Sequence, residues 1–186
     1  MTTARAFDPW IGNRYESVGL NGLRLLILGE SQYDTDEDQA RLGLPSEHAE
    51  TQKIVQHLAI DKNTSFFTKI TRLVLGHTRD FSAQEKADFW QRVAFYNFVQ
   101  WWLPKTRVRP TPQMWQAAKA PFLQVLEELK PQLVLVLGSG VTRALPPVPA
   151  HIALVSVAHP SSYGWTYEPW STKISEAVNT CAKPPT

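Results

Sequence analysis

Short runs of apolar residues recur along the chain, and glycine or a polar residue follows each one within two positions. They cover 24–28, 93–96, 133–137 and 152–157. The runs show no regular alternation of apolar and polar positions, which is the pattern of strands buried on both faces. Parallel strands covered by helices are buried in this way, so the runs predict a mostly parallel sheet.

Helical spacing of apolar residues fills the segments between these runs and predicts helices over 46–60, 66–74, 82–90, 114–129 and from about Pro169 onward. Ser82 and Glu85 have the spacing of a capping box. Pro121 is expected to kink or divide its helix. Strands that alternate with helices predict an α/β fold, a three-layer α/β/α sandwich with a short, mostly parallel sheet. The 186 residues suit one domain over 1–186.

Polar clusters follow three of the predicted strands. The first is Gly29-Glu30-Ser31-Gln32-Tyr33-Asp34, the second is Asn97, and the third runs from His159 through Ser161, Ser162 and Tyr163 to Trp165. Open α/β sheets bind their ligands at the carboxyl ends of the strands. We therefore expect the three clusters to form one site.

Simpler interpretations stand beside this one. Asn97 is also compatible with a turn cap, and a single histidine after a strand often has a structural role. Gly138-Ser139-Gly140 lacks the further residues of a nucleotide-binding loop and of a serine-hydrolase elbow, so it predicts a plain strand-to-helix turn. The acidic run 34–38 lacks the glycine and distal glutamate of a calcium loop and indicates a solvated loop.

Composition narrows the remaining classes of function. The formal net charge is +2, without the dense basic patch that is typical of many nucleic-acid-binding proteins. Cys181 is the single cysteine, which excludes an intrachain disulfide and a four-cysteine metal site. His48, His57, His77 and His151 lack metal-ligand spacing, so we expect no metal. With no apolar signal core or membrane-length run, we expect a cytoplasmic protein with no membrane partner.

Taken together, the three clusters resemble the motifs of the uracil-DNA glycosylase superfamily. Gly29 to Asp34 is similar to the first motif of the family, Gly-Gln-Asp-Pro-Tyr-His in one branch and Gly-Glu-Ala-Pro-Gly in the iron–sulfur branch. Asn97 resembles the base-reading asparagine, and His159 to Gly164 resembles the His-Pro-Ser-Pro-Leu-Ser loop. The resemblance spans roughly residues 20 to 182.

Three positions depart from the family pattern. Ser31 stands where one branch carries the aspartate that orients the attacking water, Gln32 replaces proline, and Asp34 replaces histidine. The iron–sulfur branch has alanine at the position of Ser31, but this chain lacks the cysteines of that branch. The resemblance therefore implies an outlying, cluster-free member.

The resemblance implies a uracil-DNA glycosylase-like domain that acts in DNA repair by base excision, a monofunctional hydrolase that removes uracil or another deaminated base. It assigns catalysis to His159 and Ser31, with His159 donating to a base carbonyl oxygen. It assigns base binding to Gly29, Glu30, Gln32, Tyr33, Asn97, Phe66 and Phe67. DNA contacts would come from Ser161, Ser162, Tyr163, Trp165, Lys105, Arg107 and Arg109. Base flipping would use Tyr163 as the wedge that enters the duplex in place of the flipped base. We also expect a monomer without a cofactor.

A second hypothesis is a catalytically weak or inactive family member that binds a nucleobase, a nucleotide or a nucleic-acid end. Ser31 and Gln32 motivate it because neither side chain can act as a carboxylate. The acidic run 34–38 motivates it because carboxylates near the site repel a phosphate backbone.

Overall fold

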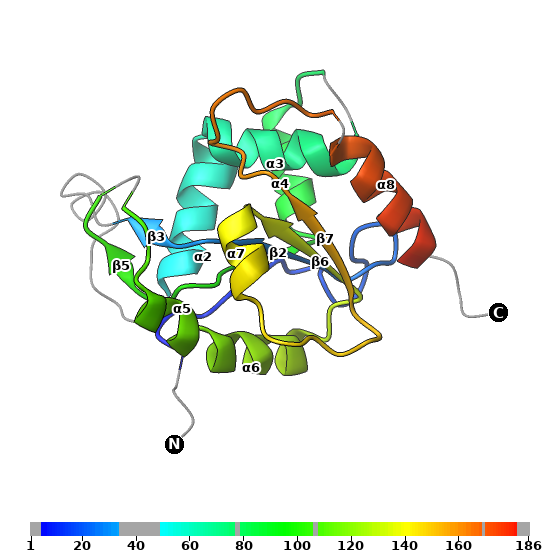
Figure 1. The fold of residues 1–186 in the computed structure, drawn as a ribbon. Helices are drawn as coiled ribbons and strands as arrows, with labels where there is room; N and C mark the ends of the chain where they lie inside the picture. The colour runs from blue at the N-terminus through cyan, green and yellow to red at the C-terminus, as the bar shows by residue number, and fades with distance from the viewer. Residues whose placement is uncertain (1–4, 34–48, 77–78, 106–107, 169, 182–186) are drawn as a thin grey trace.

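The main sheet has five strands in the order β1-β4-β2-β6-β7 (Figure 1). This computed structural model describes residues 5–33, 49–76, 79–105, 108–168 and 170–181. The strands are β1 (Trp10–Ile11), β2 (Leu25–Gly29), β4 (Ala94–Asn97), β6 (Leu133–Leu137) and β7 (Ala153–Val157). All pair in parallel except β1, which is antiparallel to β4. The four parallel strands are those that the apolar runs predicted.

Successive side chains of the central strands pack into two separate hydrophobic cores, because side chains alternate between the faces of a sheet. Leu25 and Ile27 of β2 belong to one core, and Leu26 and Leu28 belong to the other. Every residue of β2 and of β6 is buried. The lack of polar alternation in these strands therefore reflects a sheet with helices on both faces.

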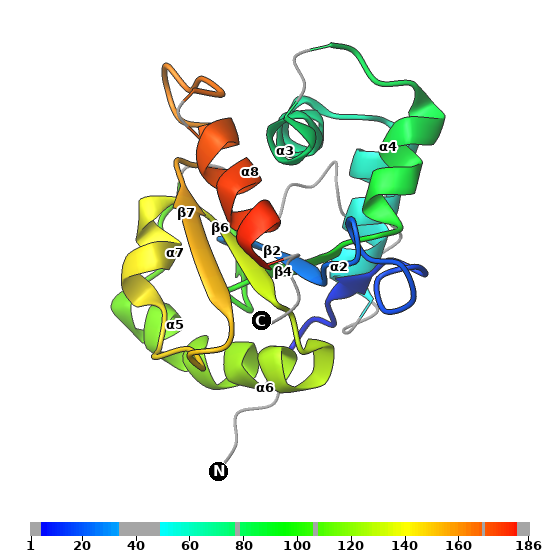
Figure 2. The same cartoon turned by 90° about the vertical axis from the view of Figure 1, so that its right-hand side faces the viewer.

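Helices cover both faces (Figures 1 and 2). The first face carries α2 (Glu50–Ile54), η1 (Val55–Asp61), α3 (Ser65–Leu75), α4 (Ala83–Trp90) and α8 (Trp170–Cys181). The second face carries α5 (Pro112–Ala117), α6 (Lys119–Leu129) and α7 (Ser139–Ala144). The mixed α/β architecture with a mostly parallel sheet is thus confirmed.

Two of the predicted helices are divided. The helix expected over 46–60 begins as α2 and continues as the π-helical segment η1. The helix expected over 114–129 is interrupted at Ala118, which separates α5 from α6. Pro121 lies in the first turn of α6, where a backbone N–H has no partner inside the helix, so the proline costs no hydrogen bond there.

The predicted capping box of α4 is confirmed. Ser82 Oγ accepts from the Glu85 backbone N–H at 3.2 Å, and the Glu85 carboxylate accepts from the Ser82 N–H at 2.8 Å.

The backbone segments that follow β2 and β4 remain paired beyond the main sheet. The Phe98 N–H donates to Gly29 O at 3.0 Å, and the Val99 N–H donates to Glu30 O at 2.9 Å. A small parallel sheet follows, formed by β3 (Gln32–Tyr33) and β5 (Trp102–Leu103). Residues 29–33 of the first predicted cluster are therefore held by backbone pairing, and Asp34 lies outside the described residues. None of the helices in the described parts of the chain combines the length and the apolar character that a membrane span requires.

Candidate functional site

The order of the strands reverses at the centre of the sheet. From β2 the chain passes through helices to β4 on one side, and then crosses to β6 on the other side. Ligand sites of open α/β sheets lie outside the carboxyl ends of the strands at such a switch point. Here that point lies between Gly29, the last residue of β2, and Gly138, which follows β6.

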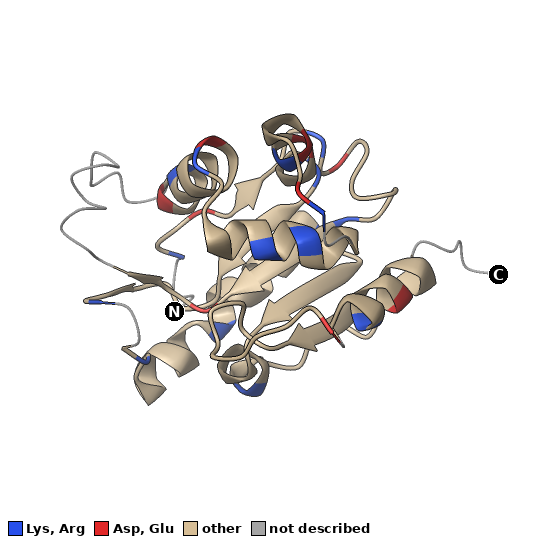
Figure 3. Ribbon diagram, turned by 90° about the horizontal axis from the view of Figure 1, so that it is seen from above, with Lys and Arg blue, Asp and Glu red and all other residues tan. Residues whose placement is uncertain are grey.

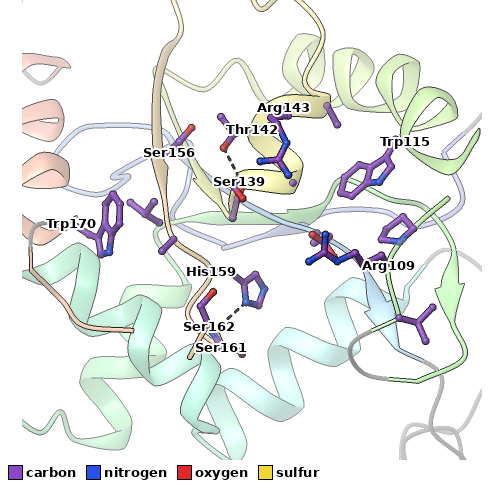
Figure 4. A pocket seen from close by; sticks show the side chains of 18 of the residues that line it. Arg109, Trp115, Ser139, Thr142, Arg143, Ser156, His159, Ser161, Ser162 and Trp170 are labelled. Atoms are coloured by element: carbon purple, nitrogen blue, oxygen red, sulfur yellow. Dashed lines mark hydrogen bonds between the residues drawn. The ribbon is translucent and has the colours of Figure 1, made fainter. Parts of the chain in front are cut away.

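An open groove lies at this position (Figure 4). Its walls come from Glu30 and Tyr33, from segments 108–115, 138–144 and 156–162, and from Trp170 and Lys173 of α8. In Figure 4 the His159 ring lies between Trp170 at one end and Arg109 with Trp115 at the other. The groove thus contains parts of two of the three predicted clusters, and Asn97 is not among its walls.

The His159 ring is fixed from several sides. Nδ1 accepts a hydrogen bond from the Ser161 N–H at 3.2 Å. The ring stacks on Phe66, with centroids 5.4 Å apart and planes inclined by 28°. On another side it packs against Gly138, where an added Cβ would lie 3.4 Å from that of His159. Because Nδ1 is an acceptor, the proton of the neutral ring resides on Nε2. His159 therefore presents an N–H donor.

Lys69 stabilises the loop that carries His159. Its Nζ donates to Pro160 O at 2.8 Å and lies 5.4 Å from the centre of the Trp165 ring. Phe66 and Lys69 are three residues apart on α3, so they share one face of the helix. One helix face thus holds both the ring and the loop.

The surroundings of His159 keep the imidazole neutral. Burial lowers the pKa of His159, and the positive charge of Lys69 lowers this pKa further. Both effects disfavour the imidazolium. The site therefore offers a neutral hydrogen-bond donor at neutral pH.

Asn97 lies at the same edge of the sheet. It is the last residue of β4 and pairs with Gly29. A Cβ added to Gly29 would lie 2.3 Å from Asn97 Oδ1, so only glycine leaves room for this amide. The Gln100 side chain donates to Asn97 O at 2.7 Å and holds the backbone there. Two strands, β2 and β6, separate Asn97 from His159, which corresponds to about 14 Å between their backbones.

The predicted base-binding residues are only partly brought together. Glu30 and Tyr33 line the groove, whereas Gly29, Ser31, Gln32, Asn97 and Phe66 are not among its walls. The assignment of Phe67 to base binding is corrected by its burial. It is 4% exposed and packs against Trp90 and Phe95 in the core, with centroids 5.3 and 5.7 Å away. No base can reach it there.

The first cluster contains buried polar groups without partners. Gln32 is 2% exposed, and both polar atoms of its amide lack hydrogen-bond partners. The Ser31 hydroxyl oxygen is likewise buried and unpartnered. A buried polar group without a partner costs free energy, so these two side chains lower the stability of the fold at this point.

The predicted DNA-contact residues differ in exposure. Ser161 and Ser162 line the groove. Tyr163 is 106% exposed at the tip of the loop, as a wedge requires. Trp165 is packed instead, because its Nε1 donates to Ala158 O at 3.1 Å and its ring contacts Tyr167.

Lysine and arginine residues are spread over several elements of the ribbon in Figure 3, and two of them, Lys69 and Arg72, belong to α3. Lys105 and Arg109 are exposed, and Arg109 lines the groove. Arg107 and the acidic run 34–38 lie outside the described residues.

Three basic residues at or beside the groove carry no motif in the sequence. Lys69 contacts the histidine loop, while Arg143 of α7 and Lys173 of α8 line the groove. Gly138-Ser139-Gly140 forms the predicted strand-to-helix turn, and this turn is also part of the groove wall. Helical spacing from Phe66 was the one signal in the sequence that pointed to Lys69. No described group of His, Cys, Asp or Glu side chains is arranged to hold a metal ion.

No protein-family model and no curated protein sequence matches this chain.

The environment of His159 predicts its titration. We expect a pKa below the ordinary value of about 6.5 in a histidine-resolved NMR titration. Lys69→Gln should raise this pKa because a positive charge is removed, whereas Lys69→Arg should leave it low. A pKa at or above 6.5 would contradict the neutral-donor assignment, and equal pKa values in the two variants would contradict the contribution of Lys69.

Proposed function

We propose that this protein is a monofunctional DNA N-glycosylase that removes uracil or another deaminated base. The observation that carries the proposal is the His159 ring, fixed as a neutral Nε2–H donor at the carboxyl edge of the sheet. The resemblance of the three clusters to the uracil-DNA glycosylase superfamily supports the same function. Their gathering at the edge where α/β sheets bind ligands adds to this support.

The chemistry of base release suits such a donor. When the N-glycosidic bond breaks, negative charge develops on the carbonyl oxygens of the leaving base. A preorganised N–H donor stabilises this charge, and the loss of one such contact costs roughly 100- to 1000-fold in rate. His159 supplies the donor without giving up a proton, because Lys69 and burial keep its ring neutral.

Asn97 is suited to selecting the base. Its carboxamide can accept from N3–H of uracil and donate to O4, whereas cytosine presents an amino group at that position. Gly29 leaves the space in which the Asn97 amide lies. Asn97 and His159 lie at the same edge of the sheet, with β2 and β6 between them.

Ser31 favours the second candidate, a protein that binds a base or nucleotide without turnover. Its hydroxyl is buried and neutral at the position of the family's aspartate. Tight binding of damaged DNA without base release would support this candidate.

Base release from oligonucleotides tests the proposal. We expect the wild type to generate alkali-labile sites in single- or double-stranded oligonucleotides that contain uracil, hypoxanthine or xanthine. His159→Ala should slow release about 100- to 1000-fold, because the developing charge loses its donor. His151→Ala is the matched control, since His151 is exposed and lies outside the groove walls. Equal rates of base release in the His159→Ala and His151→Ala variants would show that His159 does not stabilise the leaving base.

Tyr163 should distinguish duplex from single-stranded substrate. Flipping a base out of a duplex costs a few kcal/mol, and an inserted aromatic side chain offsets part of this cost. Tyr163→Ala should therefore weaken single-turnover cleavage of duplex more than cleavage of single strands. Equal losses on the two substrates would argue against the wedge.

A further inference from the structure

Glu30 places a carboxylate in the groove. The residue follows β2, and its side chain turns toward α7. An added Cβ on Gly140 would lie 3.1 Å from Glu30 Oε2 and 3.6 Å from the Trp115 ring. No described residue donates a hydrogen bond to this carboxylate, so it is free to accept one from a water molecule or a ligand in the groove.

The turn at 138–140 supports both Glu30 and His159. His159 packs against Gly138, and Glu30 packs against Gly140. The Cα atoms of two residues separated by one other are at most about 7 Å apart. The two side chains are therefore braced on neighbouring points of one turn. This spacing suits a nucleoside whose base reaches His159 while its sugar lies beside Glu30.

Ser31 and Glu30 occupy contrasting environments. The Ser31 hydroxyl is buried outside the groove walls and cannot carry a negative charge. Glu30 is the one carboxylate among the described residues that line the groove. Glycosidic hydrolysis passes through a sugar with oxocarbenium character, which a nearby carboxylate stabilises.

We infer that Glu30 is a catalytic residue that supplies the carboxylate missing at Ser31, binding the attacking water and stabilising the positive sugar. This inference rests on the proposed glycosylase function. In this arrangement the turn at 138–140 positions the side chains of Glu30 and His159.

The reaction step balances as a hydrolysis. The bond between C1′ and the base nitrogen breaks, and its electron pair leaves with the base, whose oxyanion accepts from His159 Nε2–H. The water oxygen bonds to C1′ while one water proton passes to Glu30 and then to solvent. Solvent protonates the base, so the products are the free base and an abasic site.

The environment of Glu30 suits proton acceptance. Burial raises the pKa of the Glu30 carboxyl, and the positive charge of Arg109 opposes this rise. A general base works best when its pKa lies closer to the working pH than that of a solvated carboxylate.

Glu30→Gln tests the inference, because it removes the charge and keeps the shape. We expect single-turnover base release to fall at least about 100-fold, in the range typical of a lost general base. Glu176→Gln, an exposed change on α8, is the matched control and should retain the wild-type rate. Thermal unfolding of both variants verifies that they are folded.

A binding measurement complements the rate. Oligonucleotides carry either a cationic pyrrolidine or a neutral tetrahydrofuran in place of the target nucleotide. The wild type should bind the pyrrolidine at least about tenfold more tightly, and Glu30→Gln should abolish this preference, as expected for a lost charge pair.

The outcomes separate the two levels of inference. If Glu30→Gln releases the base as fast as the wild type does, the role of Glu30 is overturned, whereas the proposed function is unaffected. If the wild type releases no base, the proposed function fails, and the preference for the pyrrolidine oligonucleotide then decides the role of Glu30. A preference that is lost in Glu30→Gln supports a carboxylate that stabilises a cation. Equal binding of the two oligonucleotides by the wild type overturns the role of Glu30.

Discussion

The parallel pairing of β2 with β4 on one side and β6 on the other is the constraint on which the site depends. It brings the carboxyl ends of four strands to one edge and places the reversal of strand order beside Gly29. Residues far apart in the chain thereby become neighbours. Asn97 lies against Gly29, and His159 lies against Gly138. The helices on both faces bury the strands and hold this edge in place.

Glycines do much of the positioning at that edge. Gly29 leaves room for the Asn97 amide, and Gly138 adopts φ +106°, a conformation that other residues avoid, where the chain turns into α7. Side chains from α3 then secure the histidine loop, through Phe66 beneath the ring and Lys69 on Pro160. The arrangement yields a neutral N–H donor on one side and a carboxylate, Glu30, on the other. These two groups match the two charges that develop when a glycosidic bond breaks.

Local patterns were sufficient for the four parallel strands, the capping box at Ser82 and the common edge of the clusters. They were insufficient where tertiary contacts decide the outcome. The two-residue strands β1, β3 and β5 exist only through their partners and carry no periodicity of their own. Phe66 and Phe67 are adjacent aromatics, and packing alone determines that Phe67 enters the core while Phe66 meets His159. The orientation of Glu30 toward α7 likewise depends on a segment more than a hundred residues away.

A crystal structure with DNA tests the central claim most directly, namely that this edge binds a flipped base between Asn97 and His159. The oligonucleotide would carry 2′-deoxy-2′-fluorouridine, whose glycosidic bond resists cleavage. We expect a uracil carbonyl oxygen within about 3 Å of His159 Nε2, the opposite base edge against the Asn97 amide, and the sugar over the turn at 138–140. A uracil bound away from both residues, or DNA bound on another face, would contradict the account.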